Sequence, residues 1–277
     1  MSEGSPLQRV VMELRLDKTV QSILAEVQSI TGKPIEYREN EHLPVAANVA
    51  FAGEGVQCHV LSYRRDAGEG VNHLIANACG FFLRMFRAGE EERRIPVANQ
   101  LTMVRFMREM KEEIDEIVVA LGADKVRQLL VVWYDGIVFQ LTRMPTDIMV
   151  EKWLYTEFPE FRSLQLKAIL QQRETAVLSL SDRIRKVMPR RIFDASHLMN
   201  YVYFRVLGDH FGVNYVNPYL GTLYREKGEG LVKITEENRL DSHEGDVRMV
   251  DLWADFLDLR ACYEWQTPRG EADRRFH

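Results

Sequence analysis

The side chains whose types and spacing most suggest chemistry lie in residues 70–86, where polar groups interrupt an apolar helical pattern. His73 and Asn77 are four residues apart, so on a helix they share one face. Two ligand side chains one turn apart are the arrangement with which a helix holds zinc. An asparagine amide is a poor partner for this purpose, and a lone histidine on a helix is more often structural. The pair therefore predicts either a polar lining for a cleft or a structural histidine in an ordinary buried helix.

The same helix resembles the active-site helix of zincin-like metallopeptidases, in which H-E-x-x-H supplies two zinc-binding histidines and the residue that polarises water. When this template is laid on residues 77–81, Asn77, Ala78 and Phe81 replace the first histidine, the glutamate and the second histidine. A methyl group accepts no proton and a phenyl ring offers no lone pair to a metal. The resemblance implies a degenerate site with no catalytic residue, no metal and no cofactor.

The resemblance spans residues 20–165 and also assigns a role to Glu151. Such peptidases often take a third, glutamate ligand from a later segment, and residues 144–151 resemble that segment. The resemblance implies that Glu151 is the residual third-ligand candidate and that it lines a cleft with His73 and Asn77. An ordinary buried helix, lodged between a sheet and other helices, is the alternative explanation.

The elements that would position these residues predict an α+β fold. Short, partly alternating segments with proline and glycine between them predict strands over residues 33–40, 46–52 and 56–64. An apolar face over residues 7–31 predicts a helix before them, ended by Gly32. The expected fold class is a small N-terminal sheet with a zincin-like motif helix, followed by a mainly α-helical C-terminal half.

The second half of the chain has helical periodicity. Apolar residues at steps of three and four predict a helix over residues 102–121, and a second helix over 123–142, broken at Gly136, would return against it. We expect a zincin-like core over residues 1–165 that includes this helical hairpin. Residues 166–277 would pack on it, as a second domain or within one continuous domain. Further predicted elements are helices over 151–188, 195–211 and 246–265, a strand over 231–235, and a cap at Thr146 or Asp147.

Composition limits the class of protein. Of the 277 residues, 46% are hydrophobic and 28% charged, which is typical of a folded domain. The formal net charge of −5 argues against a general attraction to nucleic acid or anionic membranes. Cys58, Cys79 and Cys262 have no C-x-x-C spacing, which favours free thiols in a reducing compartment. No apolar run is long enough to cross a bilayer, so we expect a cytoplasmic protein without membrane insertion.

Two other groups of side chains were weighed as sites. His197 and His210 are thirteen residues apart, roughly 20 Å along one helix, which is too far for a shared metal. A basic cluster in residues 182–191 could hold phosphate, but a solvated surface is the commoner arrangement, so nucleic acid is not the expected partner. The members of this cluster are Arg183, Arg185, Lys186, Arg190 and Arg191.

The sequence supports three hypotheses about function. The leading one is a pseudo-metallopeptidase that binds a polypeptide along its sheet edge or acts as a scaffold. The second is a hydrolase with a non-standard site at Glu151, Asp147 and His73. The third is a helical interaction subunit of a larger cytoplasmic complex, docking through residues 102–142 and its C-terminal helix. Neither the partner nor the oligomeric state follows from the sequence.

Overall fold

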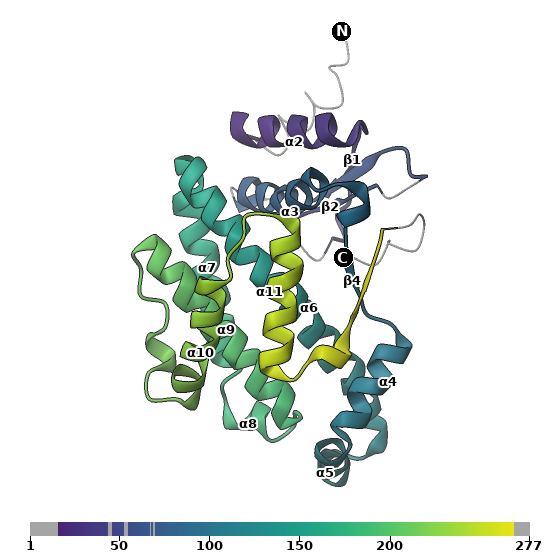
Figure 1. Ribbon diagram of the computed structural model, residues 1–277, viewed down its shortest axis with the longest axis vertical. Coiled ribbons are helices and arrows are strands. Elements are labelled where there is room, and N and C mark those ends of the chain that lie inside the picture. The colour runs from purple at the N-terminus through teal and green to yellow at the C-terminus, as the bar shows by residue number, and fades with distance from the viewer. Residues whose placement is uncertain (1–15, 44–45, 53–54, 67, 69, 269–277) are drawn as a thin grey trace. The chain divides into compact units, whose positions relative to one another are not determined.

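The computed structural model describes residues 16–43, 46–52, 55–66, 68 and 70–268. It has the predicted α+β fold, with a small three-stranded sheet near the N-terminus and a mostly helical second half (Figure 1). Its contacts divide the chain into two compact units. Unit 1 comprises residues 1–94, 150–168 and 267–277, and unit 2 comprises residues 95–149 and 169–266.

In unit 1, the sheet follows helix α2 (Lys18–Thr31). The helix predicted over residues 7–31 therefore began too early, because Asp17 has an extended backbone and is not helical, and residues 7–15 lie outside the described part of the chain. The Asp17 side chain caps the start of α2 by accepting a hydrogen bond from Val20 N, and Gly32, with φ of 66°, ends it. The three strands have the order β1-β3-β2, with β1 parallel and β2 antiparallel to β3. They are β1 (Ile35–Glu39), β2 (Ala47–Ala50) and β3 (His59–Tyr63), inside the three segments predicted as strands.

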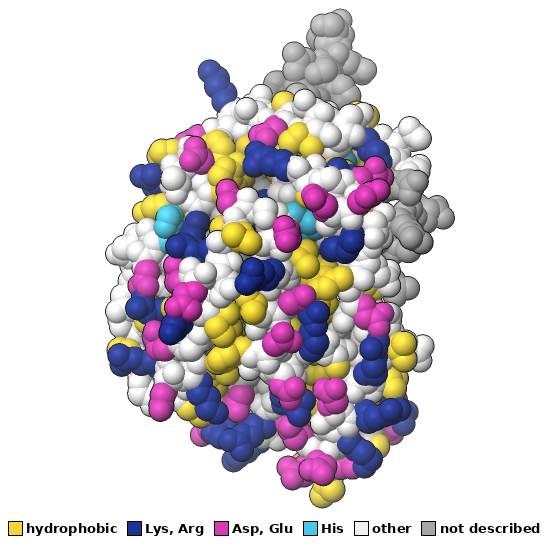
Figure 2. Space-filling model, viewed as in Figure 1, with side chains coloured by type: hydrophobic (Ala, Val, Ile, Leu, Met, Phe, Trp, Pro, Cys, Tyr) yellow, Lys and Arg dark blue, Asp and Glu magenta, His cyan; other side chains and the backbone are white. Residues whose placement is uncertain are grey.

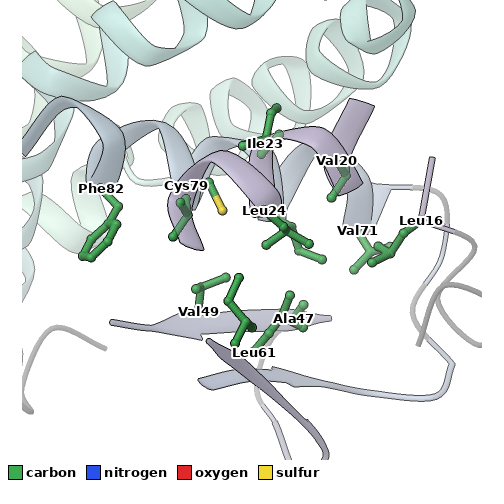
Figure 3. Packing of buried hydrophobic residues seen from close by; sticks show 14 of the residues in the cluster. Leu16, Val20, Ile23, Leu24, Ala47, Val49, Leu61, Val71, Cys79 and Phe82 are labelled. Carbon is green, nitrogen blue, oxygen red and sulfur yellow. The ribbon is translucent and has the colours of Figure 1, made fainter. Parts of the chain in front are cut away.

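The core of unit 1 lies between one face of this sheet and the helices α2 and α3 (Gly70–Arg87). Figure 3 shows Ala47, Val49 and Leu61 on the strands facing Leu24 and Cys79 on the helices. Alternate residues of β2 and β3 are buried, as expected for strands with one face in a core. This packing fixes the rotation of α3 about its own axis and so decides which of its side chains face away from the sheet.

Unit 2 is mainly helical. In this unit α9 (Arg190–Phe211) packs against α10 (Leu223–Glu237). A Cβ atom on Gly228 would overlap the ring of Tyr201, so glycine is what allows α10 to approach α9 so closely. The other elements of this unit are β4 (Ile95–Val97), α4 (Gln100–Glu109), α5 (Lys111–Leu121), α8 (Asp182–Arg185), η3 (Asn217–Tyr219), α11 (His243–Leu257), η4 (Arg260–Cys262) and β5 (Glu264–Gln266).

Helix α6 (Ala123–Glu157) corrects the largest local prediction. The sequence predicted a break at Gly136 and a new helix capped by Thr146 or Asp147, but the helix continues through Gly136 and Pro145. Proline in a helix interior removes one hydrogen bond and crowds the preceding turn. Ile148, Val150 and Leu154 beyond it are completely buried, and burial of such side chains outweighs a local cost of this size.

Three smaller predictions also differ from the structure. The helix predicted over residues 102–121 is divided into α4 and α5 at Met110, which leaves the helical region with φ −106° and ψ 17°. Residues 231–235 lie in α10 rather than in a strand, because Leu231 and Thr235 are buried on one helical face. The last helix ends at Leu257, since Asp258 adopts a left-handed conformation with φ of 56°.

The segment after Val150 was predicted to be helical. Residues 151–188, predicted as helix with a break at Pro159, form the end of α6, a short η2 (Pro159–Phe161), α7 (Arg162–Leu178) and α8. None of the helices described is long and apolar enough to cross a membrane. Residues 95–149, which include the predicted hairpin, belong to unit 2, while residues 150–168 belong to unit 1 with the sheet.

Candidate functional site

A buried cluster of polar side chains in unit 1 is the candidate site. His73 and Asn77 come from α3, Glu151 comes from the last turns of α6, and Gln165 comes from the first turns of α7. All four are buried: Glu151 is 3% exposed, Gln165 is fully buried, and His73 and Asn77 are each 8% exposed. The structure thus brings together the three residues predicted to line a cleft and adds a fourth.

The carboxylate of Glu151 is the centre of this cluster. His73 Nε2 lies 3.0 Å from Oε1 and 3.1 Å from Oε2, and Asn77 Nδ2 donates to Oε1 at 2.7 Å. Gln165 Nε2 donates to Oε2 and, at 2.6 Å, to the Glu151 backbone oxygen. A carboxylate has about four lone-pair sites, and these contacts involve both of its oxygens. The carboxylate is therefore held in place by side chains from two other helical segments.

Gly80 allows the two helices that carry the cluster to approach each other. A Cβ atom at this position would lie 2.5 Å from Val150 Cγ1 and 3.2 Å from Trp153 Cζ3. Because any larger residue would push α3 away from this part of α6, glycine sets the distance across which His73 and Asn77 reach Glu151. In the H-E-x-x-H template laid on residues 77–81, Gly80 stands at a position that requires no particular residue, so its packing role is visible only in the structure.

The face of α3 that meets Glu151 carries His73 and Asn77. The H-E-x-x-H template was laid on Asn77 and Phe81, whereas His73 and Asn77 form the equivalent pair one helical turn earlier. In that later alignment Ala78 and Phe81 pack against the hydrophobic cluster of unit 1, both partly buried. Both pairs, His73 with Asn77 and Asn77 with Phe81, are spaced four residues apart. Only His73 and Asn77 are seen to contact the Glu151 carboxylate together.

The cluster does not fit a zinc ion of the kind that the family resemblance implies. Zinc needs at least three strong ligands from imidazole, thiolate or carboxylate, and the third position here is the amide of Asn77, which directs its N–H group to Glu151. Within the described ranges no group of three or more His, Cys, Asp or Glu side chains is placed to hold a metal.

Two other residues considered in the sequence are buried without joining this cluster. Burial raises the pKa of the Cys79 thiol to about 12, which disfavours a thiolate nucleophile. Asp147, a member of the alternative hydrolase site, lies in unit 2, where its Oδ2 accepts a hydrogen bond from Tyr203 OH at 2.7 Å. Thr146 is buried inside α6 and caps no helix.

Sequence reasoning missed Gln165 and His59. Gln165 lies in a segment correctly predicted as helical, and no spacing links it to Glu151, which is fourteen residues earlier. His59, at the start of β3, is fully buried and accepts a hydrogen bond at Nδ1 from Ala52 N at 2.9 Å. Its Nε2 lies 2.8 Å from the hydroxyl of Thr31, which itself donates to Val27 O. These contacts require a neutral imidazole that carries its proton on Nε2.

The stability of the protein should depend on pH through His59. Burial, with a smaller contribution from Lys33, lowers its pKa to about 4, whereas an unfolded histidine titrates near 6.5. Because the unfolded chain takes up the proton first, stabilisation is complete above pH 6.5 and is lost as pH falls towards 4, by up to about 1.4 kcal/mol per pH unit.

The measurement is the free energy of unfolding at pH 7 and pH 5, for the wild type and for His59→Asn. Asparagine keeps an acceptor near the position of Nδ1 and cannot titrate in this range. We expect the variant to be less stable at pH 7 and to lose less stability on acidification. An equal loss in both proteins would contradict the role of His59.

His197 and the basic cluster belong to unit 2. His197 is buried between the rings of Phe193 and Tyr224, and burial lowers its pKa to about 4, while His210 is exposed. Of the basic cluster, Arg191 is the most engaged, with its side chain near Glu109 and Asp258. The other basic side chains line or flank a hollow on the surface of this unit.

Comparison with known proteins gives no family for this chain. No protein-family model, no curated protein and no solved structure matches it. The resemblance to zincin-like peptidases therefore stays a hypothesis that rests on the residues described above.

Proposed function

We propose that this protein is a non-catalytic, zincin-like module that binds an extended segment of a partner polypeptide along the free edge of its sheet. The observation that carries the proposal is the state of Glu151. Three side chains occupy its carboxylate in a buried site where a zincin-like peptidase would use the equivalent groups on a metal and a water. A hydrogen-bonded lock of this kind supports a scaffold role better than hydrolysis.

The sheet edge next to α3 has the geometry for strand addition. Strand β2 is at one edge of the sheet and, among the described residues, pairs only with β3. Ala46 O accepts a hydrogen bond from Arg64 N at 2.9 Å. Ala46 therefore directs its backbone groups towards β3, and so do Asn48 and Ala50 at steps of two along the ladder. In an antiparallel ladder the backbone groups alternate in direction, so those of Ala47 and Val49 point away from β3, towards the edge of the sheet. The two residues are 3% and 6% exposed, so these groups must become more accessible before a peptide pairs with them through its backbone, as in other strand-adding domains.

A matched pair of substitutions tests this edge. Ala47→Pro removes an outward N–H group, which an edge strand tolerates, and Ala50→Pro removes an N–H group that faces β3. Peptides selected from a random library against the wild type should bind the Ala47→Pro variant at least about tenfold more weakly, as expected when a strand pairing is lost. Amide chemical shifts of Ala47 and Val49 should move when peptide is added to the wild type.

The control and the contrary results are equally specific. Ala50→Pro should lower the thermal midpoint, because it breaks the ladder itself, whereas Ala47→Pro should leave the protein folded. The proposal fails if no peptide is enriched, or if the selected peptides bind the Ala47→Pro variant as tightly as the wild type.

A second candidate function is supported by a different observation in unit 2. Helix α6 exposes the apolar side chains of Val131, Val132 and Phe139, whose exposed fractions are 47%, 65% and 53%. Gly136 lies between them, and a Cβ atom there would meet no atom within 4 Å. An open apolar helix face of this kind favours docking of another helix, as the interaction-subunit hypothesis requires.

A further inference from the structure

The basic cluster of unit 2 borders a hollow that the proposed function does not use. The hollow has a volume of about 250 Å³ and opens on the surface between α5, α8 and the start of α9. Its lining is mixed, because the buried Ile117 and Pro189 lie there among charged side chains. Figure 2 shows Lys and Arg side chains gathered over the place of α8. The residues that line it are Glu113, Glu116, Ile117, Arg185, Lys186, Met188, Pro189 and Arg190.

Three cations face this hollow, and two of them form no ion pair within the described residues. Arg190 Nε lies 3.5 Å from Asp194 Oδ2, which is a loose ion pair. Across the described part of the chain, neither Arg185 nor Lys186 forms an ion pair with an acidic side chain. Two uncompensated cations beside a cavity attract an anion more strongly than the same charges on a convex surface, since low-dielectric walls focus their field.

The two carboxylates in the lining weaken this field unequally. Glu113 Oε2 accepts a hydrogen bond from Arg191 N at 3.0 Å, so it is committed to the first turn of α9. There it compensates the partial positive charge of the helix N-terminus. Glu116 is exposed and lies on the rim of the same hollow. It is the acidic group that would compete directly with a bound anion, and its removal should strengthen binding.

The size of the hollow limits the ligand. A volume of 250 Å³ is slightly below the range of about 300 to 1,000 Å³ that holds drug-sized molecules. It has room for a phosphoryl group with a short organic remainder but not for a nucleotide chain. Arginine and lysine side chains are the groups that bind phosphoryl oxygens, by paired hydrogen bonds and by point charge.

We propose that this hollow is an anion site for a small phosphorylated molecule, held by Arg185, Lys186 and Arg190. The apolar side chains in the lining, Ile117, Met188 and Pro189, would contact the carbon remainder of the ligand. The site is independent of the sheet edge in unit 1, so either proposal can fail alone.

Calorimetric titration of the full-length protein with inorganic pyrophosphate, at constant ionic strength, tests the site. We expect saturable binding with one ligand per chain. Lys186→Ala and Arg185→Ala should each weaken binding about tenfold, which is the loss of one charge-assisted hydrogen bond. Glu116→Gln should tighten it about threefold, by removing a repulsive charge of the strength typical of exposed pairs.

Arg183→Ala is the matched control, because Arg183 lies on α8 outside the lining of the hollow. Arg183→Ala should change the dissociation constant by no more than about twofold, because salt screens the interaction between a distant charge and the bound anion. The proposal is overturned if pyrophosphate does not bind saturably up to millimolar concentration, or if Arg183→Ala weakens binding as much as Lys186→Ala. A comparison of inorganic phosphate with glycerol phosphate separates recognition of the anion alone from contact with the carbon remainder.

Discussion

Replacing Glu151 by alanine is expected to lower the free energy of unfolding by about 3 to 5 kcal/mol. The substitution removes the acceptor for His73, Asn77 and Gln165 at once and leaves their polar groups buried without it. Each donor that loses this acceptor keeps its cost of desolvation, and the space of the carboxylate becomes a cavity. Urea denaturation of the wild type and the variant measures the difference.

Two further variants show whether the cluster is the cause. Glu157→Ala removes a glutamate from the same helix at an exposed position, and we expect a change within about 0.5 kcal/mol. Glu151→Gln keeps the shape and one acceptor oxygen, so its cost should lie between those of the two alanine variants. If Glu151→Ala proved as mild as Glu157→Ala, the hydrogen-bonded lock would not hold the helices together, and the main support for a scaffold role would be lost.

Replacing Gly80 by alanine is expected to destabilise the protein by about 1 to 3 kcal/mol, although alanine is the better helix former. The added methyl group would lie 2.5 Å from Val150 Cγ1, and Val150 is fully buried, so neither group can move without disturbing the core. The separation of α3 from α6 would also lengthen the hydrogen bonds to Glu151. Thermal or urea denaturation measures the loss.

The same substitution at Gly136 should have the opposite sign. Gly136 is exposed inside α6, and a Cβ atom there meets nothing within 4 Å. Gly136→Ala should therefore stabilise the protein by about 0.5 to 1 kcal/mol through helix propensity alone. Combining Gly80→Ala with Val150→Ala should cost less than the sum of the two single changes, because the second makes room for the first. Strict additivity, or a stabilising Gly80→Ala, would refute the close approach of the helices.

Two buried histidines of unit 1 illustrate what a single sequence can predict about a site. His73 was recognisable because its partner Asn77 is four residues away on the same helix, and helical geometry alone puts the two side chains on one face. Glu151 was reached only through the family resemblance. His59 was overlooked, because the side chain that holds it, Thr31, and the backbone of Ala52 belong to other elements, and no spacing along the chain encodes such contacts.

The sequence by itself determined the strands of the small sheet and the end of the helix before them. Alternation in β2 and β3 and the glycine at position 32 act over a few residues, and their energies favour one local conformation whatever surrounds them. The shared face of His73 and Asn77 belongs to this local category as well.

Only the tertiary structure decided the length of α6 and which side chains contact Glu151 on it. The helix continues through Pro145 because buried side chains farther along contribute more than the proline costs, and that comparison requires knowing what is buried. The joining of Gln165 to Glu151 and the need for glycine at position 80 depend on the distance between packed helices. Such distances are set by the volumes of side chains from separate segments, which a pattern along one segment does not contain.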